Sequence, residues 1–239
     1  MIRTKKINYA AIIQVRTGSK RLPNKSLLDL GSLKTIEWVI KRVKKTSLLD
    51  EIILATTKKQ EDKIFNKFAK KNKIKIFFGD EKNVLKRFCD AGEKFRVHNI
   101  IRICADRPFI DPKFIDKLIN FFKKNKCDLA FNHVSNKKLK FKCIDGFGAE
   151  VFSLQSLKKI QEKTFNKNDL EHVTKYFYNN KRFKVSPVPV KKLFKRSQIS
   201  LDLDTKKDFV YLNNLVKKNN FNIFSKSENI VKAAIYESN

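Results

Sequence analysis

The first half of the chain alternates short apolar runs rich in β-branched residues with longer segments whose apolar residues recur every three or four positions. The runs have the length and composition of buried strands, and the longer segments have the period of helices with one apolar face. Strands are expected at residues 10–15, 51–56, 74–78 and 99–103. Helices are expected at residues 35–46, 60–71 and 83–95, with another beginning at Asp111 and Pro112. Strands that alternate with helices predict a parallel sheet covered by helices on both faces.

After residue 125 the pattern becomes less regular. Extended segments are expected at residues 129–131, 149–153, 183–187 and 201–203, and helices at 154–163 and 170–178. A last helix is predicted to follow Asp204 or Thr205 as its N-cap. No repeat or low-complexity linker divides the chain, so we predict a single α/β domain over residues 1–239, with an inserted arm at about 130–190.

Composition adds a strong positive charge to this picture. The chain has 54 lysines and arginines against 24 aspartates and glutamates, a formal net charge of +30. Such a balance suits nucleic acid or an anionic membrane surface. However, the excess is mostly lysine spread over every predicted helix, without a basic tail, so we interpret it mainly as a compositional bias. A basic nucleic-acid-binding protein remains the alternative of a different class. Apolar runs are too short for a signal peptide or a membrane span, and we expect a cytoplasmic protein.

The first candidate site is the loop "VRTGSKRLPNK" that follows the first predicted strand. It gathers Arg16, Lys20, Arg21 and Lys25, and guanidinium groups match the geometry of phosphate oxygens. In parallel sheets, ligands bind beyond the carboxyl ends of the strands, which is where this loop lies. The spacings of a P-loop and of a dinucleotide-binding loop are both absent. We therefore predict a triphosphate cradle, with a solvated surface loop as the alternative. Asn24 is expected to adopt a left-handed turn.

Carboxylates supply the second candidate site. Asp106 in "RICADRPFIDP" follows the fourth predicted strand, where it could hold Mg²⁺ or merely cap a turn. Asp111 is expected to cap the next helix. In "LDLDTKKDF" we expect Asp202 and Asp204 to point to opposite faces of an extended segment, so that only one shares a site with Asp106. Two carboxylates around one Mg²⁺ would form a phosphoryl-transfer centre.

In this order, the motifs resemble the cytidylyltransferases that activate sugar acids, including the acylneuraminate and 3-deoxy-manno-octulosonate enzymes, and most of all the spore-coat-polysaccharide branch. The resemblance covers nearly the whole chain. It is carried by "IIQVRTGSKRLPNK", "EWVIKRVKKTSLLDEIILAT", "GDEKNVLKRF", "RICADRPFIDP", "GFGAEVFS", "LEHVTKYFY" and "LDLDTKKDF". It implies a three-layer, Rossmann-like nucleotide-diphospho-sugar transferase fold with an inserted dimerisation and acceptor arm. It also implies transfer of CMP from CTP to an acidic sugar with release of pyrophosphate, Mg²⁺ as cofactor, and a homodimer.

The resemblance also implies roles for individual residues. Arg16, Lys25 and Asp106 would be catalytic, and Asp106 and Asp204 would bind the metal. The residues implied to bind the nucleotide are Arg16, Thr17, Gly18, Ser19, Arg21, Lys25 and Asp106. Asn24 and Arg107 depart from the residues most relatives carry at these positions.

The acceptor side is the least determined part of the prediction. Its candidate residues are Arg107, Asp145, Glu150, Glu171 and His172. Arg107 hints at an acceptor with additional negative charge, such as a phosphorylated small molecule that would give a CDP-linked product. A salt bridge from Arg107 to Asp106 or Asp111 is the competing interpretation. Arg87 could reach a ligand but is expected to be a solvated charge, and His133 is assigned no role.

Overall fold

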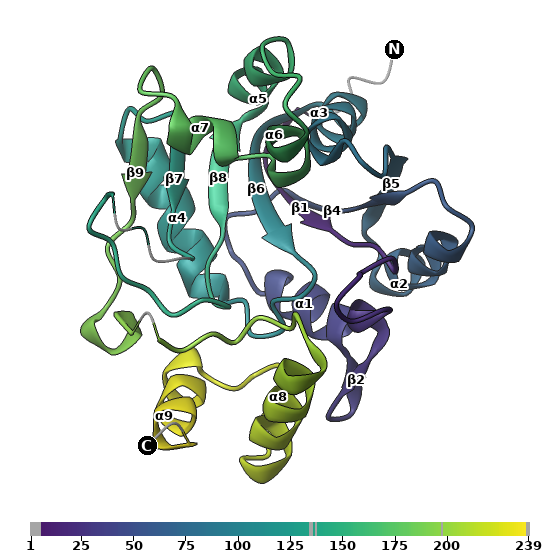
Figure 1. Cartoon of the computed structure of the whole chain (residues 1–239), viewed down its shortest axis with the longest axis vertical. Coiled ribbons are helices and arrows are strands. Elements are labelled where there is room, and N and C mark those ends of the chain that lie inside the picture. The colour runs from purple at the N-terminus through teal and green to yellow at the C-terminus, as the bar shows by residue number, and fades with distance from the viewer. Residues whose placement is uncertain (1–5, 134–135, 137, 197, 238–239) are drawn as a thin grey trace.

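The computed structural model describes residues 6–133, 136, 138–196 and 198–237. Its centre is a seven-stranded sheet with the strand order β5-β4-β1-β6-β8-β7-β9 (Figure 1). All neighbouring strands pair in parallel except β8, which runs antiparallel to β6 and β7. The strands are β1 (Ile7–Gln14), β4 (Glu51–Thr57), β5 (Lys75–Gly79), β6 (Val97–Cys104), β7 (Leu129–Phe131), β8 (Glu150–Ser153) and β9 (Val185–Pro187). The predicted α/β class and mostly parallel sheet are confirmed.

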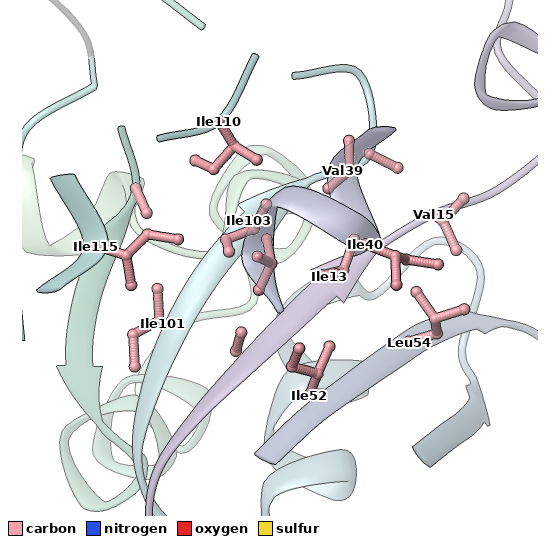
Figure 2. Close-up of a cluster of buried hydrophobic side chains, with 14 of the residues drawn as sticks. Ile13, Val15, Val39, Ile40, Ile52, Leu54, Ile101, Ile103, Ile110 and Ile115 are labelled. Carbon is pink, nitrogen blue, oxygen red and sulfur yellow. The ribbon is translucent and has the colours of Figure 1, made fainter. Parts of the chain in front are cut away.

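Alternation of side chains along the strands gives the sheet two apolar faces. In β1, Ala11 and Ile13 enter one buried cluster, whereas Ala10 and Ile12 enter another. The first cluster is covered by α1 (Thr35–Val43), α2 (Phe65–Asn72) and α4 (Pro112–Lys124). The second is covered by α3 (Val84–Lys94), α5 (Leu154–Gln161) and α7 (Lys175–Asn179). Figure 2 shows isoleucines of β1, β4 and β6 meeting Val39 and Ile40 of α1 in the first cluster.

Part of the predicted arm continues the central sheet. β7, β8 and β9 extend it beyond β6, and an irregular excursion connects β7 to β8. The helix expected at residues 170–178 is instead two short helices, α6 (Lys167–His172) and α7. Between them Val173 has a φ of 54°, a left-handed value that breaks the helix. Local periodicity did not reveal this break because the apolar spacing continues through it.

The C-terminal part of the chain packs at the end of the sheet toward which β1 and β6 point (Figure 1). Residues 201–203, expected as a strand, are extended but form no strand. Two helices follow, α8 (Lys206–Lys218) and α9 (Ser227–Glu237), with α9 not anticipated from the sequence. Together with Trp38 and Phe109 they enclose a third apolar cluster. The hairpin β2 (Asp29–Leu30) and β3 (Leu33–Lys34) was also unforeseen.

Short 3₁₀ helices complete the described elements: η1 (Lys25–Leu27), η2 (Glu61–Ile64) and η3 (Lys192–Phe194). η2 replaces the first turn of the helix predicted at residues 60–71. Within the described ranges, none of the helices combines the length and the apolar character that crossing a membrane would require.

Candidate active site

The two sequence motifs meet at the carboxyl edge of the sheet. The basic loop leaves the end of β1, and Asp106 follows the end of the adjacent strand β6. The segment before α8 reaches the same edge, because the Leu203 N–H donates to the Asp106 carbonyl at 2.8 Å. Segments almost a hundred residues apart are thereby brought to one place.

Lys25 stands at the centre of this arrangement. Its Nζ lies 2.6 Å from Asp106 Oδ2 and 2.8 Å from Asp204 Oδ1. Arg21 reaches the other oxygen of Asp204 at 3.0 Å. Burial alone would lower the pKa of Lys25, but the Asp106 and Asp204 carboxylates outweigh burial and raise this pKa above its usual value. Lys25 is therefore a fully charged ammonium shared by two carboxylates.

A buried carboxylate that the sequence analysis overlooked anchors the basic loop. Asp62 accepts hydrogen bonds from the Thr17 N–H and the Thr17 hydroxyl, both at 2.7 Å, and from the Thr57 hydroxyl. Thr17 was expected to contact nucleotide, but here Asp62 occupies both of its donors. One signal was present in the sequence: Asp62 falls on the apolar face that continues with Phe65 and Ala69, where a carboxylate needs partners.

The rest of the loop presents its groups outward. Asn24 adopts the expected left-handed conformation, with a φ of 56°. Ser19 turns the loop by donating its N–H to the Thr17 carbonyl, and its hydroxyl accepts from the Leu22 N–H. Around Gly18 the space for a Cβ is open, so the backbone there is accessible to a ligand. Arg16 is half-exposed and lies 3.8 Å from Glu171.

Beyond β6, the acceptor-side candidate Glu150 is the hub of a buried polar cluster. It accepts from Arg102 Nη1 at 2.7 Å and from the hydroxyls of Thr174 and Tyr178 at 3.0 Å. His133 Nε2 lies 3.2 Å from the same carboxylate. Burial alone would raise the pKa of Glu150, but Arg102 and His133 hold this pKa well below its usual value. Glu150 is thus a buried anion whose charge is balanced within the protein.

Arg107 is also committed to internal ion pairs. Its Nε lies 3.3 Å from Asp202 and its Nη2 lies 3.5 Å from Asp145. These carboxylates, and not the Asp106 or Asp111 considered from the sequence, are its ion-pair partners. Asp111 instead caps α4 by accepting from the Lys113 N–H, as predicted. The Arg107 side chain is only 10% exposed, so the sequence-based hint of a cation offered to the acceptor loses its basis.

The expectation that Asp202 and Asp204 face opposite ways is wrong. Leu201 and Leu203 are both fully buried in the third apolar cluster, so the aspartates that alternate with them share the other face. Side chains two residues apart in an extended segment point to the same face. The two carboxylates differ instead in the cations that they contact. Asp204 contacts Lys25 and Arg21, whereas Asp202 contacts Arg107. Burial raises the pKa of Asp202 to about 7, despite the nearby guanidinium.

Arg87 departs from expectation, whereas the role predicted for His172 is untested. Arg87, predicted as a solvated charge, is 2% exposed and donates to the Asp80 carbonyl at 2.7 Å. Burial, together with repulsion from Arg16, lowers the pKa of Arg87 to about 10. His172 has an exposed side chain, and its carbonyl accepts from the Thr174 N–H across the turn at Val173. Its sequence-predicted role toward the acceptor stays a prediction.

A basic loop facing two carboxylates at the carboxyl edge of a parallel sheet is typical of nucleotide-binding enzymes. A cytidylyltransferase family model matches residues 10–230, nearly the entire chain. The chain belongs to the cytidylyltransferase family. The nucleotidyltransferase activity expected from the sequence is thereby confirmed at the level of the family.

Curated relatives extend this result. A protein of Methanocaldococcus jannaschii described as uncharacterized, MJ1063, is 40% identical over 199 residues, 83% of this chain and 79% of its own. The spore coat polysaccharide biosynthesis protein SpsF of Bacillus subtilis is 30% identical over 213 residues, 87% of this chain and 85% of its own. The 3-deoxy-manno-octulosonate cytidylyltransferase of Fusobacterium nucleatum is 33% identical over a shorter stretch of 135 residues, 56% of this chain and 53% of its own.

Solved structures share the fold of this cytidylyltransferase. A cytidylyltransferase from Leptospira borgpetersenii superposes with a TM-score of 0.88 at 23% identity, covering 97% of this chain and 95% of the other. A CMP:2-keto-3-deoxy-manno-octonic acid synthetase complexed with CTP superposes with a TM-score of 0.67 at 15% identity. The superposition covers 89% of this chain and 99% of the synthetase chain. At these identities the likeness establishes the architecture, and the Rossmann-like fold expected from the sequence is confirmed.

Proposed function

We propose that this cytidylyltransferase transfers CMP from CTP to an acidic sugar of the octulosonate or nonulosonate type, with release of pyrophosphate. The observation that carries the proposal is the convergence of Lys25 and Arg21 on Asp106 and Asp204. One site thus contains both the cations that would bind phosphate oxygens and the carboxylates that would bind a metal. One curated relative is named for spore coat polysaccharide biosynthesis and another is named 3-deoxy-manno-octulosonate cytidylyltransferase, which supports a sugar-acid acceptor.

The donor set fits Mg²⁺. Mg²⁺ uses one or two carboxylates and completes its coordination with phosphate oxygens and water. Asp106 and Asp204 present one oxygen each to the same point, where Lys25 Nζ lies in this structure. No cluster of three or more histidine, cysteine, aspartate or glutamate side chains suited to a metal occurs among the described residues. When bound, Mg²⁺ would supply positive charge that stabilises the phosphoryl oxygens of the transition state.

The residues of the loop would hold the nucleotide and stabilise the leaving group. Arg16, Arg21 and Lys25 would bind the phosphates, and their charges would oppose the negative charge that grows on the departing pyrophosphate. A hydroxyl oxygen of the acceptor attacks the α-phosphorus and gives up its proton to water, while the bond between the α-phosphorus and the oxygen that bridges to the β-phosphorus breaks and pyrophosphate leaves with that oxygen. This chemistry needs no covalent nucleophile from the protein, in keeping with a site built from arginine, lysine and aspartate.

The charge of the acceptor side bears on the choice of acceptor. The alternative of a phosphorylated acceptor depended on Arg107 as an additional cation. Since Arg107 is buried and its guanidinium already contacts Asp202 and Asp145, no observation now favours that alternative. The acidic sugar is therefore the acceptor that we propose, with the relatives as its support. A homodimer remains a prediction, as does the positioning of the acceptor by Asp145, Glu150, Glu171 and His172.

Pyrophosphate release tests the proposal. The purified protein is incubated with Mg²⁺, each of CTP, UTP, GTP and ATP, and a panel of sugar acids and phosphorylated small molecules. We expect release with CTP and a sugar acid. Asp204→Asn should lower kcat by about 10²-fold or more, because a metal ligand is lost. Asp29→Asn, an exposed carboxylate on the β2–β3 hairpin, is the matched control and should keep full activity.

Release without preference for CTP would contradict the nucleotide assignment. Release only with phosphorylated acceptors would overturn the sugar acid in favour of the CDP-linked product. Full activity of Asp204→Asn, with an unchanged circular dichroism spectrum, would remove Asp204 from the metal site.

A further inference from the structure

The Lys25 ammonium lies where a metal ion would have to bind. Mg²⁺ binds carboxylate oxygens at about 2.0–2.1 Å. A metal liganded by both Asp106 Oδ2 and Asp204 Oδ1 would need the position that Lys25 Nζ occupies, at 2.6 and 2.8 Å from these same two oxygens. The ammonium and the metal are therefore mutually exclusive by space as well as by charge.

The surroundings favour the ammonium over a metal that arrives alone. The side chains of Lys25 and Asp106 are 17% and 21% exposed, so little water competes for their contact. Arg21, whose side chain is 66% exposed, adds a second and more solvated positive charge on Asp204. Charge-assisted pairs of this length are strong where solvent is largely excluded. A divalent cation must displace Lys25 from both contacts before it can bind between Asp106 Oδ2 and Asp204 Oδ1.

A triphosphate changes this balance. Its oxygens offer Lys25 and Arg21 partners of higher negative charge, and Arg16 could likewise exchange Glu171 for a phosphate. Movement of Lys25 toward phosphate uncovers the Asp106 and Asp204 oxygens that a metal needs. Anything that draws Lys25 away thus favours the metal, and by linkage the metal favours the triphosphate by the same factor.

We propose that Lys25 is an internal counterion that blocks divalent-metal binding between Asp106 and Asp204 until a nucleoside triphosphate draws it away. This inference rests on the proposed function for the identity of the triphosphate. It assigns Lys25 a second role, beyond phosphate binding, in deciding the order in which the site fills. Metal and nucleotide enter together, and either one alone binds weakly.

Mn²⁺ binding to the nucleotide-free protein tests the inference. Free Mn²⁺ is counted by electron paramagnetic resonance in titrations of the wild type, Lys25→Met and Lys25→Arg. We expect Lys25→Met to bind Mn²⁺ more tightly than the wild type by about 5- to 150-fold, the usual range of coupling between sites. Lys25→Arg keeps a cation and should stay close to the wild type. Lys126→Met, an exposed lysine after α4 at the opposite edge of the sheet, is the matched control and should not change Mn²⁺ affinity.

Asp204→Asn in the Lys25→Met background should remove the gained affinity, which would place the Mn²⁺ at these carboxylates. Equal Mn²⁺ affinity in the wild type and in folded Lys25→Met would overturn the inference. So would a gain that survives Asp204→Asn. Calorimetry of CTP with Mg²⁺ on the same wild-type preparation tests the proposed function separately: absent CTP binding would contradict that function, while the Mn²⁺ comparison would still decide whether Lys25 blocks the carboxylates.

Discussion

Single carboxylates hold this protein's polar interior together. Glu150 in β8 joins β6, α7 and the segment that follows β7, because Arg102, Tyr178 and His133 all approach it. A buried ion pair adds little net stability compared with apolar packing, but removing one partner leaves the other charge uncompensated. The identity of Glu150 therefore matters more than the general polarity of its surroundings.

Replacement of this carboxylate should be costly at neutral pH. We expect Glu150→Gln to lower the free energy of unfolding by about 3–5 kcal/mol at pH 7, since Arg102 loses its counter-ion. The folded protein depresses the pKa of Glu150, so the stability that its charge contributes is complete above about pH 4.5. That stability is lost as the pH falls toward the folded-state pKa. Urea unfolding at pH 7, 5, 4 and 3 measures the free energy of unfolding of both proteins. The difference in this free energy between wild type and variant should become smaller at pH 4 and pH 3.

The exposed Glu162 offers a matched control, since Glu162→Gln removes the same charge from a solvated position. The free energy of unfolding of Glu162→Gln should equal that of the wild type at every pH. A gap for Glu150→Gln that is equally large at pH 3 and pH 7 would contradict a role for the ionised carboxylate.

At the scale of elements, helix ends position the site. α8 begins at a capping box in which the Thr205 hydroxyl accepts from the Asp208 N–H, and Asp208 accepts from the Thr205 N–H. Asp208 also accepts from the Asp204 N–H at 3.1 Å, so this cap fixes the residue that we propose as a metal ligand. The predicted N-cap was Asp204 or Thr205, and the structure confirms Thr205.

Loss of this cap should weaken α8. Thr205→Ala is expected to lower the free energy of unfolding by about 1 kcal/mol. For a protein of this size the melting temperature should fall by about 2–4 °C in calorimetry. Asn214→Ala, at an exposed position inside α8, replaces a weak helix former and should leave the melting temperature unchanged or slightly higher.

A double variant with Asp208→Ala checks the mechanism. The two side chains form one reciprocal motif. The free energy of unfolding of the double variant should therefore fall by less than the sum of the decreases in the two single variants. Fully additive losses would show that the two residues act independently.

At the scale of the whole molecule, the formal net charge of +30 gives the protein an overall positive field. A field of one sign raises the rate at which an oppositely charged ligand arrives, and salt screens it. The CTP that we propose as substrate would be such a ligand. The positive charge, to which composition alone assigned no function, would then speed the capture of this nucleotide.

We therefore expect the association rate of a fluorescent CTP analogue to fall several-fold between about 50 and 200 mM NaCl, as the screening length shortens. Stopped-flow mixing measures this rate, and the dissociation rate should change less. The corresponding nucleoside without phosphates is the control and should associate equally fast at both salt concentrations. A CTP association rate that does not change with salt would contradict electrostatic capture.

The sequence alone determined most of the elements and the two motifs of the site. Strands such as β1 and helices such as α1 were predictable because their side-chain periodicity follows from local backbone geometry. The positions of Arg21, Lys25 and Asp106 at strand ends followed from the same pattern, together with the rule that parallel strands present ligands at one edge.

Tertiary structure alone decided which polar and charged groups meet. Asp62 with Thr17, Asp202 with Arg107 and Glu150 with Thr174 are pairs from separated segments, and no local spacing encodes them. The break at Val173 and the missing strand at residues 201–203 likewise depend on contacts with distant partners. Periodicity reports which face of an element is buried, but burial of a charged group is tolerable only where folding supplies a counter-ion or hydrogen-bond donors, and these come from elsewhere in the chain.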